Sequence, residues 1–473
     1  MPVYDTNDRD KMKRVPYETL QTFNFNQMKE TNFNSSIPGK LLNRNKLQSN
    51  LHGIKNLFIT WKGLLIISCL SVFLILQSCE NRGSQNQLKT DPFPEVPEHV
   101  ERIETVSVGN NREFLINDTP FFPIMSWAQP VKNYRLLDSL GFNTHAGNAD
   151  PEAAREVGCY AIPGYKPDRQ DNGYIMALIF DDEPDMPSGK GEEAKPRQTP
   201  EQVAEKMKTI RGSFPEKLVF MTFTGHFTVE QSTYPGEVRK SLYPQYVKMP
   251  DVVGFDIYPI YGSGYAAHLN WVGSGVSQLR ELAGNKPVYA WIETSKGSRW
   301  MSYEKQPDVL PIHTRNEVWQ AIINGATAIG YFTHAWEPSF IEFAPTEMMR
   351  AELKRLNHQI SRLSPAILAA PAKENISMKL GDDLYCQFKA TNYNSELFIF
   401  ALNSDLGDGA EHAKQFDPIS PRKGKAFFTV EGLKAGTPIE VIDENRTITA
   451  ENDSFSDDFE PLAEHVYRIK INR

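Results

Sequence analysis

The sequence is 473 residues long, enough for one large domain and a second, smaller one. Apolar residues make up 40% and charged residues 23% of the chain, which is ordinary for globular proteins and excludes wholesale disorder. The formal net charge of −8 argues against a nucleic-acid partner, and without zinc-type cysteine spacing, a Walker loop or a dinucleotide fingerprint we expect no metal and no organic cofactor.

The N-terminal region contains an uncharged apolar run over residues 64–76, which has the length of a signal-peptide core. Lys55 and Lys62 precede the run, and it ends in Leu-Gln-Ser-Cys, with the small residue Ser78 directly before Cys79. This pattern resembles the bacterial lipoprotein signal, in which the cysteine is lipidated and becomes the new N-terminus. The resemblance implies lipidation at Cys79 and an exported protein anchored to a membrane, on its periplasmic face or at the cell surface. A plain signal anchor is the alternative.

The chain divides into four segments by composition. Residues 1–79 form a polar extension followed by the signal peptide, and we leave them out of the fold prediction. Residues 80–100 are polar and proline-rich, as suits a linker. Residues 101–365, with a short β-like lead-in, and residues 366–473 differ in their patterns and are predicted to be two domains.

The segment 101–365 alternates short apolar runs with amphipathic stretches. Its runs lie at 121–127, 142–147, 159–165, 174–180, 218–225, 252–260, 287–294 and 328–335. They are continuously apolar rather than strictly alternating, which favours strands of a parallel sheet that is buried on both faces. Helical patterns separate most of them, so we predict an α/β fold, a (β/α)₈ TIM barrel.

One connection of the predicted barrel is too short for a helix. Only Lys-Pro-Asp-Arg-Gln-Asp-Asn-Gly separates the third run from the fourth, whereas a helical crossover takes a dozen or more residues. Either the third helix is missing or one of these strands is misplaced.

Residues 366–473 carry short alternating segments separated by polar turns, without a helical pattern among them. Examples are the stretches 396–404 and 425–432, in which apolar residues cluster at β spacing. We predict a C-terminal antiparallel β-sandwich.

Carboxylates follow two of the predicted barrel strands at the end where TIM barrels carry their catalytic groups. The fourth strand ends in Ile-Phe-Asp-Asp-Glu-Pro, which supplies Asp182 and Glu183, and the seventh ends in Ala-Trp-Ile-Glu, which supplies Glu293. Carboxylates have no packing role in an apolar run and are costly to bury unpaired. A retaining glycosidase needs two such groups about 5–5.5 Å apart, one to protonate the departing oxygen and one to attack the anomeric carbon.

This arrangement resembles the large glycoside hydrolase clan of β-galactosidases, β-mannanases and cellulase-like enzymes. The resemblance implies a carbohydrate substrate, with Glu183 as acid/base and Glu293 as nucleophile. It also implies that Trp336, after the eighth strand, is an aromatic platform for sugar and that Tyr258 holds the nucleophile by hydrogen bonding. Asp182 stands where the clan usually has an asparagine that bonds the sugar 2-hydroxyl.

Further polar and aromatic residues end other strands and are candidates for binding sugar hydroxyls or stacking on sugar rings. They are His145, Asn148, His226, Asp256 and Trp291. A structural role is the alternative for each of them, and for Glu183 in a solvated acidic loop or Glu293 in an ion pair with Lys296 or Arg299.

Two other functions are compatible with the same residues. The adjacent pair Asp182–Glu183 is similar to the acidic pair of N-acetylhexosaminidases, in which the acetamido group of the substrate attacks and Glu293 has no nucleophilic role. The second is a surface-tethered glycan-binding protein without catalysis, which the short third connection and the missing asparagine favour.

Overall fold

The computed structural model describes residues 93–189, 191–381 and 384–470. The predicted signal peptide, the lipidation site Cys79 and most of the predicted linker lie outside these residues. Among the described helices, none is both long enough and apolar enough to cross a membrane.

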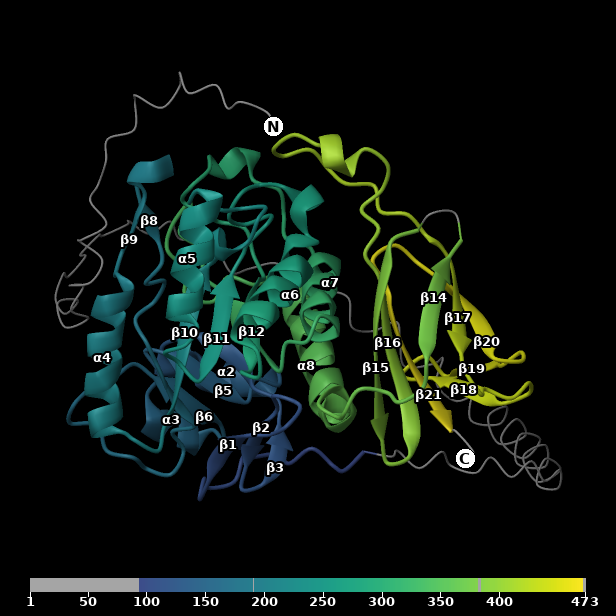
Figure 1. Cartoon of the computed structure of the whole chain (residues 1–473), viewed down its shortest axis with the longest axis horizontal. Coiled ribbons are helices and arrows are strands. Elements are labelled where there is room, and N and C mark those ends of the chain that lie inside the picture. The colour runs from purple at the N-terminus through teal and green to yellow at the C-terminus, as the bar shows by residue number, and fades with distance from the viewer. Residues whose placement is uncertain (1–92, 190, 382–383, 471–473) are drawn as a thin grey trace, which may run out of the picture. The chain divides into compact units, whose positions relative to one another are not determined.

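The first domain is built on an eight-stranded parallel sheet (Figure 1). Its strands are β4 (Ile124–Trp127), β5 (Thr144–Gly147), β6 (Tyr160–Pro163), β7 (Ala177–Ile179), β10 (Leu218–Thr224), β11 (Val252–Asp256), β12 (Val288–Glu293) and β13 (Ala328–Phe332). Their order is β6-β5-β4-β13-β12-β11-β10-β7, and single parallel bridges between Ala161 and Ile175 and between Gly164 and Ile179 join the two ends. The sheet is therefore a closed barrel, and all eight predicted strands are confirmed.

Helices cover the outside of the barrel. They are α2 (Tyr134–Ser139), α3 (Pro151–Glu156), α4 (Pro200–Ser213), α5 (Gly236–Tyr246), α6 (Trp271–Ala283), α7 (Pro311–Ile323) and α8 (Glu347–Ile367). Helix α4 starts as its sequence predicts, because Thr199 and Gln202 form a capping box and Pro200 takes the first helical position. No helix lies between β6 and β7 among the described residues, so the third helix is indeed missing.

Aromatic and aliphatic side chains fill the inside of the barrel. Tyr289 and Trp291, two residues apart on β12, both point into the barrel. The Thr222 hydroxyl of β10 contacts both, at 2.7 Å from Tyr289 Oη and 3.2 Å from Trp291 Nε1. A lead-in of three short strands, β1 (Val106–Val108), β2 (Phe114–Ile116) and β3 (Thr119–Phe121), joins this core through Phe114, whose ring stacks on Phe220 at 5.6 Å. The interior is a packed core, so ligands can enter only at the rim.

The C-terminal domain consists of two antiparallel sheets, as predicted. One has the order β14-β17-β20 and the other β15-β16-β21-β18-β19. The strands are β14 (Ile376–Leu380), β15 (Cys386–Tyr393), β16 (Glu396–Asn403), β17 (Gly424–Val430), β18 (Pro438–Val441), β19 (Arg446–Thr449), β20 (Ser454–Phe459) and β21 (Glu464–Lys470). Phe428 stacks on Phe455 at 4.7 Å within their shared core, which is the inner layer of a sandwich.

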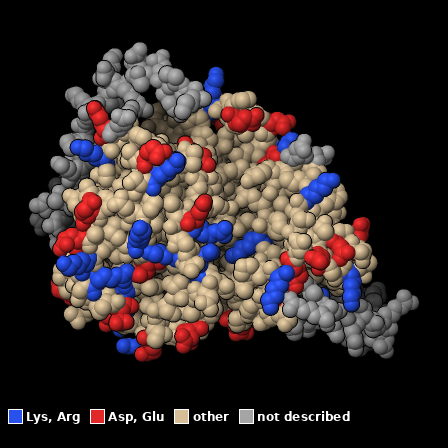
Figure 2. All heavy atoms as spheres, in the orientation of Figure 1, with Lys and Arg blue, Asp and Glu red and all other residues tan. Residues whose placement is uncertain are grey.

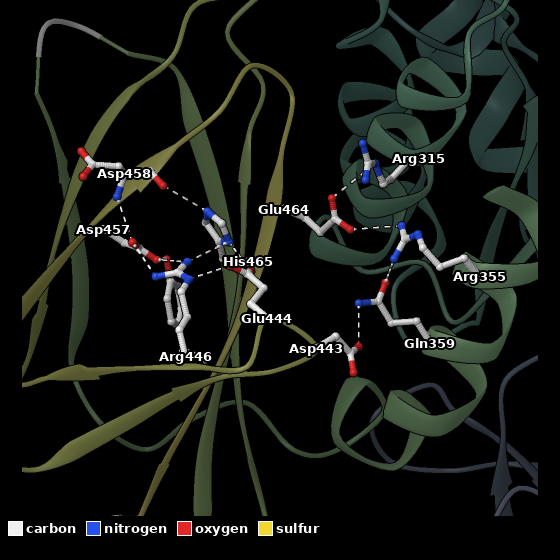
Figure 3. Close-up of polar contacts among 11 residues, drawn as sticks. Arg315, Arg355, Gln359, Asp443, Glu444, Arg446, Asp457, Asp458, Glu464 and His465 are labelled. Carbon is white, nitrogen blue, oxygen red and sulfur yellow. Dashed lines mark hydrogen bonds and ion pairs between the residues drawn. The ribbon is translucent and has the colours of Figure 1, made fainter. Parts of the chain in front are cut away.

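The sandwich packs on the side of the barrel that carries α7 and α8 (Figure 1). Figure 3 shows the polar part of this junction, where Glu464 of β21 lies between Arg315 of α7 and Arg355 of α8, at 3.5 and 3.3 Å. Deeper in the junction, the buried amide of Asn316 donates to the carbonyls of Asn403 and Leu462. Buried polar groups that are satisfied only across the junction fix its geometry.

The loop between β16 and β17 reaches past the junction to the rim of the barrel. The side-chain amide of Gln415 donates to the Ser263 carbonyl at 2.9 Å, and the backbone N–H of Phe416 donates to the Gly264 carbonyl at 2.8 Å. Both carbonyls belong to the loop that follows β11. The sandwich therefore supports part of the surface on which the predicted site lies.

Candidate active site

The carboxylates that follow β7 separate into different environments. Asp181 turns to the outside of the barrel, where it pairs with Lys206 of α4 at 2.5 Å and accepts a hydrogen bond from Gln198 at 2.9 Å. Asp185 is fully buried and accepts hydrogen bonds from the backbone and hydroxyl of Thr224 and from the hydroxyl of Tyr243. Burial outweighs these bonds and raises the pKa of Asp185 to about 6. Both residues hold the loop in place.

Asp182 and Glu183 remain at the rim and meet Asp256 at the end of β11. The carboxyl groups of Glu183 and Asp256 are hydrogen bonded to each other, and Asp182 interacts electrostatically with both. Desolvation by the protein crowded around its carboxyl group, followed by the charge of Glu183, raises the pKa of Asp182 to about 8, even though the residue as a whole is exposed at the rim. The same two causes hold the pKa of Asp256 well above its usual range. Carboxyl groups with pKa values moved toward neutrality are typical of acid/base catalysis.

A basic residue and a strained backbone fix Glu183 in this cluster. Arg197 pairs with the Glu183 carboxylate at 3.3 Å and also donates to the Asp182 carbonyl at 2.6 Å. Glu183 has a φ of 50°, a left-handed conformation that non-glycine residues rarely adopt. Such strain persists where the surrounding structure fixes the residue, and it clusters at functional sites.

Tyr258 connects the carboxyl cluster to a series of aromatic rings. Burial and the neighbouring carboxyls of Asp256 and Asp182 raise the pKa of Tyr258 well above its usual range, so it keeps its proton. Its ring packs against Phe332 at 5.1 Å and against Tyr261 at 6.0 Å. The described partners of the Glu293 carboxylate are Ile260, Tyr261 and Glu317, so the expected hydrogen bond from Tyr258 to Glu293 stays a prediction.

The Glu293 carboxylate is held by partners other than the members of this cluster. It is fully buried and accepts hydrogen bonds from the backbone N–H groups of Ile260, at 2.9 Å, and Tyr261, at 2.5 Å. Its third partner is the carboxyl group of Glu317, on helix α7 outside the barrel. Burial raises the pKa of Glu293 to about 7 and, with the charge of Glu293, holds the pKa of Glu317 well above its usual range. A carboxylate held in this way braces the loop after β11 against α7.

Two other predicted substrate contacts are buried in the structure. His145 is fully buried between the sheet and α2, where it stacks on Tyr134 at 3.8 Å and bonds the Ser126 hydroxyl at 2.8 Å. Burial lowers its pKa to about 3, so it is a neutral core residue. Trp291 packs edge-on against Trp127 at 5.1 Å in the barrel core, with 2% of its surface exposed. The expectation that these two side chains bind sugar is corrected, because neither is accessible to it.

His226 and Asn148 lie on loops after their strands. His226 is half-buried and is held by its own loop, since its Nδ1 atom lies 3.1 Å from the Gln231 carbonyl oxygen and 3.2 Å from the Thr233 backbone nitrogen. Burial lowers its pKa. Asn148 is exposed after β5. Neither of them is among the groups that interact with the carboxyl cluster.

Trp336 belongs to an aromatic group at the rim, most of which the sequence analysis did not single out. Trp336 packs on Phe340 at 4.9 Å, and the Arg299 guanidinium lies over the rings of both Trp336 and Trp300, at 5.0 and 5.7 Å. Trp300 also meets Tyr261 edge-on at 6.0 Å, which connects this group to Tyr258. Trp300 and Phe340 are about half exposed, at 55% and 49%, as binding platforms are and core residues are not.

Metal-binding groups and surface charge bear on which other ligands the protein could hold. The described residues contain no group of three or more His, Cys, Asp or Glu side chains that could hold a metal ion. Figure 2 shows acidic and basic side chains interspersed over the face that it displays. Cys159 and Cys386 are buried free thiols, and burial raises the pKa of each to about 12, so they stay protonated.

No family model and no curated protein matches the chain. Solved structures do resemble it. A GH30 endoxylanase from Clostridium papyrosolvens C71 is 12% identical with a TM-score of 0.39, over 77% of this chain and 99% of that one. A structure described as a glycoside hydrolase is 10% identical with a TM-score of 0.47, over 77% and 96%. An α-amylase from Geobacillus thermoleovorans is 8% identical with a TM-score of 0.42, over 77% and 99%.

The buried Glu293–Glu317 pair makes a testable contribution to the pH dependence of stability. The folded-state pKa of Glu293 is raised above its unfolded value, so the folded protein keeps a proton that the unfolded chain loses between pH 4.5 and about 7. Stability therefore falls as the pH rises through this window, by at most about 1.4 kcal/mol per pH unit for each proton. We expect Glu317→Gln, whose amide donates to Glu293 at any pH, to make the fall shallower in urea unfolding between pH 5 and 8. Equal slopes for the variant and the wild type would contradict a shared proton.

Proposed function

We propose that the protein is a glycoside hydrolase that uses the carboxyl groups after β7 and β11 as its acid/base machinery. The observation that carries the proposal is the meeting of Asp182, Glu183 and Asp256 at the rim of a closed barrel. Loss of water and mutual repulsion raise the pKa values of Asp182 and Asp256, which is the kind of tuning that glycosidic bond cleavage requires.

Within this cluster, Asp182 is the group best placed to give a proton to a departing sugar oxygen. Its side chain reaches solvent, and with its pKa raised to about 8 it is protonated at neutral pH. The Glu183 carboxylate is engaged by Arg197 and Asp256. In this proposal the proton donor is Asp182 and not Glu183, to which the sequence resemblance assigned the role. The negative charge of Glu183 helps to keep the pKa of Asp182 raised.

The aromatic group at the rim supports a carbohydrate substrate. It lies on the loops after β12 and β13, and β13 is opposite β7 in the barrel order. Flat exposed rings such as Trp300 and Phe340 suit the apolar C–H faces of sugars, and the Arg299 guanidinium between Trp300 and Trp336 supplies donors for hydroxyl groups. A sugar chain held there would face the carboxyl cluster across the mouth.

The proposal predicts that Asp182→Asn lowers kcat at least 100-fold on an aryl glycoside that the wild-type protein cleaves. The kcat/KM of the wild type should fall as the pH rises through about 8, because Asp182 then loses the proton that it must donate. Asp181→Asn is the matched control, since Asp181 faces Lys206 outside the mouth, and we expect its kcat within a few-fold of the wild type. An Asp182→Asn variant with wild-type kcat, or a wild type that cleaves no glycoside in a broad chromogenic panel, would contradict the proposal.

The burial of Glu293 favours a second, narrower function, substrate-assisted cleavage of N-acetylhexosaminides. In the retaining scheme with two protein carboxylates, Glu293 would have to leave two backbone amides and Glu317 to reach an anomeric carbon. When the acetamido group of the substrate attacks instead, no second protein carboxylate is needed, and an adjacent acidic pair such as Asp182–Glu183 suffices.

This second function predicts cleavage of aryl N-acetylhexosaminides but not of the matching sugars without the acetamido group, and inhibition by a thiazoline mimic. Glu293→Ala should then lower the stability of the protein, and added azide should yield no glycosyl azide. Formation of a glycosyl azide by Glu293→Ala from a plain aryl glycoside would instead identify Glu293 as the nucleophile of the retaining scheme.

We also propose that the protein is exported and anchored by lipid at Cys79. The support is the sequence pattern alone, an apolar run at 64–76 that ends in Ser78-Cys79. In a bacterial host, Cys79→Ala should abolish incorporation of labelled palmitate and move the protein out of the membrane fraction. Cys69→Ser, within the apolar run, is the control and should keep the label. Labelling of Cys79→Ala at the wild-type level would disprove the anchor.

A further inference from the structure

A cavity of about 680 Å³ lies between the barrel and the sandwich, apart from the carboxyl cluster. Its barrel side is formed by the segment just before and at the start of α6, including His268 and Trp271. Its sandwich side is formed by the start of the loop between β16 and β17, together with Tyr385 and Arg422. No residue of the proposed catalytic cluster lines it, so it is a separate site.

Two aromatic side chains on the barrel side of the cavity, His268 and Trp271, belong to a stack of three rings. Tyr265, His268 and Trp271 are stacked in parallel, with ring centroids 4.5 and 3.8 Å apart and interplanar angles of 13° and 10°. The stack supports the half-buried Trp271 ring from behind. Burial lowers the pKa of His268 to about 4, so the imidazole is neutral, and its buried Nδ1 atom has no hydrogen-bond partner among the described residues. The stacked rings give the cavity an apolar, aromatic wall.

Charged groups in fixed geometry form the other side. The Asp405 carboxylate accepts two hydrogen bonds from the Arg422 guanidinium, at 2.9 and 2.7 Å, and the exposed Asp408 carboxylate lies 3.1 Å from the same guanidinium. Tyr385, beside them, exposes 49% of its surface. Because the salt bridges hold these side chains in place, little conformational entropy is lost when a ligand bonds to them.

The chemistry of the lining selects among ligand classes. Carboxylates outnumber the guanidinium, with Glu411 as a third acid, which disfavours phosphates and other anions. A purely apolar ligand would cover the exposed Asp408 carboxylate and remove water from it without offering it a hydrogen bond. A neutral ligand with many hydroxyl groups satisfies both sides, since its hydroxyls bond the carboxylates and the guanidinium while its C–H faces pack on aromatic rings.

We propose that this cavity is a second saccharide-binding site. It would hold a sugar unit of a polymer between Trp271 on the barrel side and Tyr385 on the sandwich side. The choice of sugar among neutral polyhydroxylated ligands rests on the proposed function, whereas the site itself rests on the lining. Such a site keeps a polysaccharide bound to the protein while the carboxyl cluster at the barrel rim acts on another part of the same polysaccharide.

Affinity electrophoresis of the full-length protein tests the proposal, with soluble xylan, starch, galactomannan and glycol chitin in the gel. Asp182→Asn is the parent, so that no polymer is cut during the run. We expect at least one polymer to retard the parent, and Tyr385→Ala or Asp408→Ala to weaken that retardation about tenfold in apparent dissociation constant. Phe427→Ala, which removes a similarly exposed ring (45%) outside the cavity, is the control and should not change it.

Activity measurements separate this inference from the proposed function. Tyr385→Ala in the otherwise wild-type protein should cleave a small aryl glycoside at the wild-type rate. Retardation that depends on Tyr385 in a protein without hydrolytic activity would refute the proposed function and keep the second site. Hydrolysis with unchanged retardation in both Tyr385→Ala and Asp408→Ala, or no retardation of the parent by any polymer, would refute the second site.

Discussion

The ion pair between Arg197 and Glu183 is the contact on which the mouth of the barrel depends. Three carboxyl groups, Asp182, Glu183 and Asp256, meet at one rim, and their repulsion and loss of hydration oppose that arrangement. Arg197 offsets part of this cost, and its second bond, to the Asp182 carbonyl, holds the backbone that carries Glu183 at a positive φ. One guanidinium thus balances the charge and supports the strained turn.

The available partners also explain why Glu293, after β12, is in a different environment from Asp182, after β7. Glu293 finds two backbone N–H groups and a second carboxyl group that can share a proton, so it is satisfied without water or ligand. The Asp182 carboxyl group has no such partners among the described residues, and the residue is exposed. Two acidic residues at equivalent ends of barrel strands can therefore be a structural brace in one case and a candidate proton donor in the other.

The barrel was predictable from sequence because strands buried on both faces leave continuous apolar runs, and the eight-residue gap after the third run revealed the missing helix. Other elements carry weaker signals, because Pro244 interrupts the helical pattern of α5 and β20 (Ser454–Phe459) is too polar to stand out as a strand. Within the site, the position at a strand end located Asp182, Glu183 and Asp256. It could not tell which way His145 and Glu293 point, because that depends on partners far away in sequence. Arg197 lies in a loop whose sequence carries no periodic signal.

The contact of Gln415 and Phe416 with the loop after β11 has a consequence for how the chain can be divided. That loop supplies the amides that hold Glu293 and carries Tyr258 beside the carboxyl cluster. Cutting the chain after α8 would remove these supports together with the junction at Asn316. The C-terminal sheets thus belong to the architecture of the barrel mouth, and the barrel alone would lack part of the support for its rim.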